Sequence, residues 1–312
     1  MPVPLQRHNI ARLGRLEFLA RSTVEGFITG LHKSPFHGFS VEFAEHRQYN
    51  PGESTRHMDW KLFARTEKLF LKRFEEETNL RAQLVLDVSS SMWYPSGVDP
   101  KGPDLNKIKF SIYAAASLME LFRRQRDAIG LSLFGDDLQT HTPARSSSAH
   151  HRGLIHLLED LLDRSADAPA IRTSGPEALH AIAEATPKRA LIILFSDMFD
   201  GHEQADAWMD ALQHMRHNKH EVVVFQVLDE TTEGRFDFDN RPTVFRDLET
   251  GDEVRLHPEE VRSIYLERMN SVRQNLRERC AQNQIDLVEV DIQSGLEAVL
   301  SAYLLKRQRM RV

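Results

Sequence analysis

The sequence predicts an α/β protein with a doubly wound, mostly parallel sheet flanked by helices. From Arg81 onward, short apolar runs alternate with longer amphipathic runs, which is typical of strands connected by helices. The apolar runs are nearly continuous, as expected of parallel strands that are buried on both faces. With 312 residues, 41% hydrophobic and 28% charged, the chain has a globular composition and can bury a core.

Six strands and six helices follow from this rhythm. We expect strands at Ala82–Val88, Ala128–Phe134, Leu138–Ala144 (a weaker edge strand), Arg189–Phe195, Glu221–Leu228 and Ile285–Val290. We expect helices at Asn106–Arg124, Ala149–Leu162, Gly175–Ala185, Glu203–Asn218, Pro258–Gln282 and Ser294–Arg307, the last with Ser294 as its N-cap. A short hairpin between Thr231 and Leu256 interrupts the alternation.

Residues 1–80 differ in kind from the rest. A helix is expected over Ile10–Arg21, followed by a stretch that is dense in glycine, histidine and aromatic residues and has no clean period. Such a stretch cannot easily build its own core, so we expect it to pack on the α/β unit. We therefore predict an irregular N-terminal extension over residues 1–80 and an α/β domain over residues 81–312.

Composition excludes several classes of protein. The chain has 46 acidic and 40 basic residues, a net charge of −6, which disfavours a nucleic-acid partner. Its one cysteine, Cys280, forms no intrachain disulfide and no multi-cysteine metal site. The N-terminus lacks the apolar core of a signal peptide, and the longest apolar runs are too short for a transmembrane segment. These observations predict a cytoplasmic protein.

Oxygen-bearing side chains follow two of the predicted strands. Asp87, Ser89 and Ser91 come at the end of the first strand, and Asp197 comes directly after the fourth. Ligands of open α/β sheets bind at the carboxyl ends of strands. Thr173, just before a predicted helix, is a fifth candidate. A few carboxylates and several hydroxyls suit Mg²⁺, so the sequence predicts a magnesium site formed by these five residues.

Two stretches of sequence resemble known families. Asp87-Val-Ser-Ser-Ser-Met, Thr173 and Leu194-Phe-Ser-Asp197 resemble the metal-ion-dependent adhesion site of von Willebrand factor type A domains, which have a Rossmann-like fold. The stretch from Phe43 to Arg65, with Arg47, Pro51-Gly52, Asp59 and Trp60, is similar to the signature of the domain of unknown function 58 family. Two departures are an Ile-Arg pair before Thr173 in place of the usual glycines, and Glu53 in place of aspartate.

The resemblance implies adhesion rather than turnover. In type A domains the serines and the threonine contact the metal, and the aspartates act directly or through water, which leaves a coordination place for a partner's carboxylate. It implies a non-enzymatic, metal-dependent interaction module that binds Mg²⁺ or Mn²⁺. The implied partner is a MoxR-type AAA+ ATPase, with which the chain acts as an adaptor or co-chaperone.

Three alternatives stay open on the residues alone. Asp87 also suits the nucleophile of a magnesium-dependent phosphohydrolase, although a catalytic lysine and a second aspartate two residues later are not found. The site also suits an interaction domain that binds no metal. The charged residues of the signature suit either a structural anchor or a contact surface.

Overall fold

The structure is a computed structural model of the chain. It describes residues 16–32, 46–48, 63, 65, 69–72, 80–99, 102–135, 137–163, 175–198, 205–248 and 250–310. The chain divides into two compact units, one formed by Met1–Phe27 with Leu80–Val312 and the other by Ile28–Asn79. In the second unit, β1 (His46–Gln48) pairs antiparallel with β2 (Phe70–Lys72).

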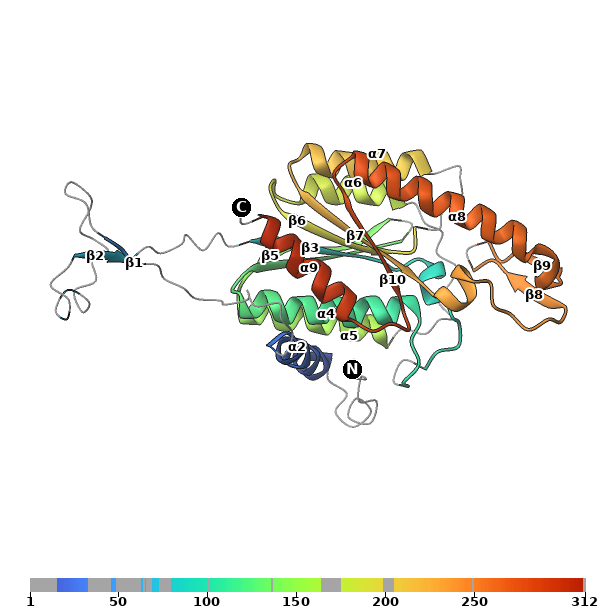
Figure 1. Cartoon of the computed structure of the whole chain (residues 1–312), viewed down its shortest axis with the longest axis horizontal. Coiled ribbons are helices and arrows are strands. Elements are labelled where there is room, and N and C mark those ends of the chain that lie inside the picture. Colours follow the sequence, from blue (N-terminus) through green and yellow to red (C-terminus); the bar gives the residue numbers. More distant parts are fainter. Residues whose placement is uncertain are drawn as a thin grey trace. The chain divides into compact units, whose positions relative to one another are not determined.

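The first unit is built on a six-stranded sheet (Figure 1). Its strands are β3 (Arg81–Asp87), β4 (Ala128–Phe134), β5 (Leu138–Arg145), β6 (Leu191–Ser196), β7 (Glu221–Leu228) and β10 (Asp286–Asp291). They lie in the order β10-β7-β6-β3-β4-β5, and every pair is parallel except β4 with β5. The predicted doubly wound, mostly parallel sheet is confirmed, and the weak strand is indeed an edge strand.

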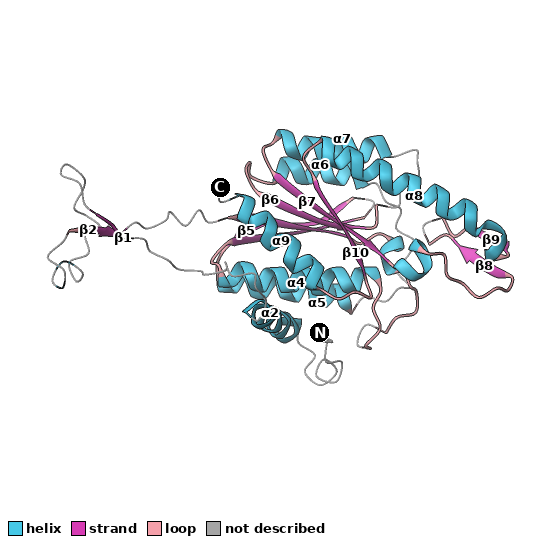
Figure 2. Cartoon of the chain, viewed as in Figure 1, coloured by secondary structure: helices cyan, strands magenta, loops and turns pink. Residues whose placement is uncertain are grey.

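Helices cover both faces of this sheet (Figure 2). One face carries α4 (Lys107–Arg124), α5 (Ser148–Leu162) and α9 (Glu297–Met310). The other carries α6 (Gly175–Ala185), α7 (Ala205–His217) and α8 (Pro258–Gln282). Alternate strand residues such as Val85, Ile192 and Val224 pack against α6, α7 and the end of α8, so the core lies in layers above and below the sheet.

The helix α2 (Leu16–His32) continues past the predicted end at Arg21. Its first turns bury Leu16, Leu19 and Val24. The Leu16 amide donates to Glu159 of α5, and Glu25 pairs with Arg124 of α4. The beginning of this helix therefore packs on the α/β unit. The other residues of the predicted helix, 10–15, lie outside the described residues.

Two local predictions are wrong or incomplete. Ser294 does not cap the last helix, which begins at Glu297; its hydroxyl instead donates to the Asp291 carbonyl in a turn that contains Gly295 at φ +84°. The region between Thr231 and Leu256 holds the predicted hairpin, β8 (Thr243–Arg246) and β9 (Glu253–Leu256). Ahead of it lies η3 (Glu230–Gly234), a π-helical turn that the sequence pattern did not predict.

A pair of glycines tests the close packing of β4 against its neighbours. A Cβ added at Gly130 would lie 2.1 Å from Gln83 Oε1 and 2.5 Å from the Thr142 carbonyl oxygen, whereas nothing lies within 4 Å of one added at Gly153 in α5. We expect Gly130→Ala to lower the free energy of unfolding by about 1–3 kcal/mol and Gly153→Ala to raise it by about 0.5–1 kcal/mol. Urea unfolding of both variants measures this. Equal effects would contradict the register of β4.

Candidate functional site

The candidate site lies where the strand order reverses. From β3 the chain continues to β4 on one side, whereas β6, β7 and β10 lie on the other side. Ligands of doubly wound sheets bind at the carboxyl ends of the strands beside this reversal. Asp87 is the last residue of β3, and Asp197 directly follows the neighbouring β6. The structure therefore brings the two predicted aspartates to one edge of the sheet.

Asp87 is buried and held by hydrogen bonds from two chain segments. Its Oδ1 accepts from the Ser89 amide at 2.9 Å, and its Oδ2 accepts from the Ser196 hydroxyl at 2.7 Å. Burial and the nearby charge of Asp197 raise the pKa of Asp87 to about 7. A carboxylate with this pKa gains from a positive charge placed beside it. The sequence did not point to Ser196, although it stands next to Asp197.

Ser89 and Ser91 face each other in the loop after β3. Ser89 is fully buried, Ser91 lies in the 3₁₀ turn η2 (Ser90–Trp93), and their Oγ atoms are 3.1 Å apart. Two adjacent ligands of an octahedral Mg²⁺, with bonds of about 2.0–2.1 Å, are roughly 3 Å apart. The two hydroxyls thus fit a divalent cation in position and in chemistry. Four of the five predicted ligands lie together, and Thr173 lies outside the described residues.

A buried lysine that the sequence analysis missed completes the site. Lys107, the first residue of α4, has a side chain that is 1% exposed, and its Nζ lies 2.7 Å from Asp197 Oδ2 and 2.7 Å from Glu233 Oε1. Burial alone would lower the pKa of Lys107, but the two carboxylates outweigh it and raise that pKa. A lysine at a helix N-terminus is disfavoured by the helix dipole, so its presence there was the one sign in the sequence that carboxylates lie near Lys107.

Glu233 reaches the lysine from the π-helical turn η3. Its Oε2 accepts from the Asp229 amide at 2.9 Å, and its carbonyl accepts from the Tyr265 hydroxyl. Tyr94, which follows η2, donates to Thr232 at 2.8 Å. The turn is therefore fastened both to the loop that carries the serines and to the lysine. π-Helical turns of this kind are frequent at functional sites.

The donor set of this site is unlike that of a zinc site. Among the residues that the structure describes, no group of three or more histidine, cysteine, aspartate or glutamate side chains is arranged to hold a metal. The candidate site offers serine hydroxyls and two aspartates instead, which suits a hard cation such as Mg²⁺. Of the N-terminal signature, residues 43–45, 49–62 and 64 lie outside the described residues, so its role stays a prediction.

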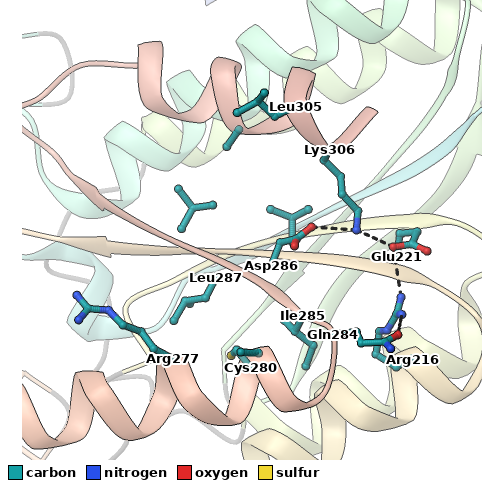
Figure 3. A pocket seen from close by; sticks show the side chains of 14 residues that line it. Arg216, Glu221, Arg277, Cys280, Gln284, Ile285, Asp286, Leu287, Leu305 and Lys306 are labelled. Carbon is teal, nitrogen blue, oxygen red and sulfur yellow. Dashed lines mark hydrogen bonds and ion pairs between the residues drawn. The ribbon is translucent and has the colours of Figure 1, made fainter. Parts of the chain in front are cut away.

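A separate cavity of about 660 Å³ lies against the edge strand β10, between α8 and α9 (Figure 3). Its apolar side chains include Ile285, Leu287 and Leu305. Its charged groups pair with one another: Lys306 contacts Glu221 at 2.6 Å and Asp286 at 2.9 Å. Glu221 and Asp286 are the first residues of β7 and β10. The cavity therefore lies at the amino-terminal ends of the strands, whereas Asp87 lies at the carboxyl ends. It is not part of the candidate site.

The chain belongs to the family described as protein of unknown function DUF58, whose model matches residues 45–275. Uncharacterized proteins of Mycobacterium bovis and Mycobacterium tuberculosis are 26% identical over 220 residues, which is 70% of this chain and 65% of each relative. The chain thus covers less than two thirds of these relatives. The description of this family assigns no activity, so membership by itself fixes neither a reaction nor a partner.

Two solved structures are similar to the chain at low scores. An aerotolerance-related membrane protein from Bacteroides fragilis is 17% identical with a TM-score of 0.44, covering 71% of this chain and 97% of its own. The VWA domain of SpRpn10, a von Willebrand factor type A domain, is 11% identical with a TM-score of 0.35, covering 71% and 94%. The fold class is therefore assigned from the order and direction of the strands in this chain's own sheet.

The expectation of a cytoplasmic protein is corrected here. The similar protein from Bacteroides fragilis is named a membrane protein, so composition alone did not justify that placement. In the described parts of the chain, no helix has both the length and the apolar character needed to cross a bilayer.

The raised pKa of Asp87 predicts a pH dependence of stability. The folded state binds this proton more tightly than the unfolded state does, so the stabilisation is present at acidic pH and is lost as the pH rises through about 7. With a chelator present, we expect the Asp87 contribution to fall by about 2–3 kcal/mol between pH 5 and pH 8. Urea unfolding of the wild type and Asp87→Asn at both pH values measures it.

Other ionisable groups also contribute to the pH dependence of stability, so the difference between the wild type and Asp87→Asn is the relevant quantity. The exposed Asp160 of α5 provides a matched control, because Asp160→Asn should follow the wild-type dependence. An Asp87→Asn curve that runs parallel to the wild type would contradict a proton held on Asp87.

Proposed function

We propose that this chain is a non-enzymatic interaction module that binds Mg²⁺ or Mn²⁺ at the carboxyl edge of its sheet. The bound ion holds an acidic side chain of a protein partner. One observation carries the proposal: Asp87, Ser89, Ser91 and Asp197, from two neighbouring strand ends, gather at one place. The 3.1 Å separation of the serine oxygens supports a divalent cation there.

The residues have separate roles in this proposal. Ser89 and Ser91 would hold the ion through neutral oxygens, and Asp87 and Asp197 would balance its charge. Thr173, which lies outside the described residues, is proposed as a fifth ligand. When bound, the ion supplies a coordination place that a carboxylate can fill. Because most of the ligands are neutral, the ion keeps its attraction for an anionic partner.

The partner follows from the family resemblance. We propose a MoxR-type AAA+ ATPase that presents an acidic residue, with this chain as its adaptor or co-chaperone. The chain's net charge of −6 makes a metal-bridged contact to an acidic partner more fitting than a direct one, because the ion supplies the positive charge. Ser89 and Ser91 then decide whether the partner binds.

A magnesium-dependent phosphohydrolase is the second candidate, and one observation favours it. The sequence pattern indicates no catalytic lysine, but Lys107 lies in the same site, 2.7 Å from Asp197. Its ammonium is nevertheless engaged by two carboxylates, and Ser89 stands where such enzymes need a second aspartate. Phosphate release from a generic ester that disappears in Asp87→Asn would favour this reading over adhesion.

Ser89→Ala tests the proposed adhesion directly. The assay is a pull-down of a MoxR-type ATPase from the source organism in the presence of Mg²⁺. Because a hydroxyl ligand is lost, we expect Ser89→Ala to recover less than a tenth of the amount of ATPase that the wild type recovers. A chelator should reduce recovery by the wild type to the same level.

Ser148→Ala is the matched control. This exposed serine is the first residue of α5. It follows the end of β5 that pairs with the amino end of β4, and so lies away from the carboxyl ends that carry the candidate site. It should recover as much partner as the wild type. Equal recovery by all proteins, with and without chelator, would favour an interaction domain that needs no metal and would overturn the proposal.

A further inference from the structure

The ammonium of Lys107 is a fixed positive charge inside the proposed cation site. It lies 2.7 Å from Asp197 Oδ2, the same aspartate that the proposal assigns to the divalent ion. Its second contact, Glu233 Oε1, comes from 126 residues further along the chain. With 1% of the side chain exposed, water screens this charge poorly. The lysine and the proposed divalent ion are therefore both attracted to Asp197.

The surroundings of Lys107 show that it is held by charge rather than by helix geometry. Lys107 begins the 18-residue α4, where the helix dipole disfavours a cation. The N-cap of this helix is already supplied by Asn106, whose side chain accepts from the Lys109 amide. The hydroxyls of Ser89 and Ser91 lie 3.1 Å apart, within hydrogen-bond distance of each other. The ammonium thus engages Asp197, and the two serine oxygens form the neighbouring part of the site.

We propose that Lys107 competes with the divalent ion for Asp197 and thereby sets the affinity of the serine site for the ion. This inference depends on the proposed function and deepens it. By neutralising Asp197 and Glu233, the lysine keeps the affinity for the ion alone low, since two positive charges repel each other in a buried site. A partner's carboxylate restores the missing negative charge, so ion and partner bind best together. The site then engages metal chiefly when an acidic partner is present.

Lys107→Met tests this inference. The Mn²⁺ affinity of this variant and of the wild type is measured by titration calorimetry at pH 8. Removing the rival charge should tighten Mn²⁺ binding at least tenfold. Lys109→Met is the matched control, because the Nζ of Lys109 donates to the backbone carbonyls of Asp99, Gly102 and Asp104 rather than to a carboxylate of the site. It removes the same charge from the same helix and should leave the Mn²⁺ affinity within twofold of the wild type.

A second pair of variants covers the case in which Lys107→Met does not fold. Glu233→Gln alone should weaken Mn²⁺ binding, because it removes a negative charge from the site. The double variant Lys107→Met with Glu233→Gln removes both members of the ion pair and leaves no unpaired Glu233. It should bind Mn²⁺ at least tenfold more tightly than Glu233→Gln alone.

Ser89→Ala separates this inference from the function on which it depends. Tighter binding without Lys107, abolished by adding Ser89→Ala, supports both. Equal Mn²⁺ affinity with and without Lys107, still abolished by Ser89→Ala, overturns the role of the lysine and leaves the metal site standing. No Mn²⁺ heat in the wild type or any variant overturns both the inference and the metal dependence of the proposed function.

Discussion

The ion pair between Lys107 and Asp197 is the interaction on which the architecture of the site depends. It joins the start of α4 to the end of β6 across 90 residues of sequence, and Glu233 extends it to the turn after β7. A buried ammonium is costly unless carboxylates surround it, so Lys107 is buried at low cost only where these three segments meet. The result is a compact arrangement of charges at the one edge of the sheet where the strand order reverses.

Around that pair, neutral oxygens and charged groups have different tasks. The serine hydroxyls, 3.1 Å apart, offer an oxygen-lined place for a small ion, and Asp87 lies behind them, held by Ser196. In the proposed function, mostly neutral ligands would leave the bound ion electron-poor, which favours adhesion to an anion over covalent chemistry. The turn η3 is hydrogen-bonded to Tyr94 through Thr232. It carries Glu233, whose carboxylate contacts Lys107.

Much of this could be predicted from sequence because apolar runs mark buried parallel strands. The strands β4 and β7 begin and end where predicted. The sequence also predicts Asp87 and Asp197 at one edge of the sheet, because Asp87 ends one such strand and Asp197 comes just after another. Lys107 could not be placed in the same way, since its partners are 90 and 126 residues away and Glu233 belongs to an irregular π-helical turn. Ser294 illustrates the opposite error: a serine near a helix start serves a turn instead of the cap.

The position of a bound ion tests the account most directly. In crystals grown with Mn²⁺ and an acidic peptide or partner domain, an anomalous difference map should show one Mn²⁺ in direct contact with both Ser89 Oγ and Ser91 Oγ. Lys107 should remain on the side of Asp197 and Glu233, away from the serines. Mn²⁺ bound elsewhere on the chain, with the two serine hydroxyls still contacting only each other, would contradict it.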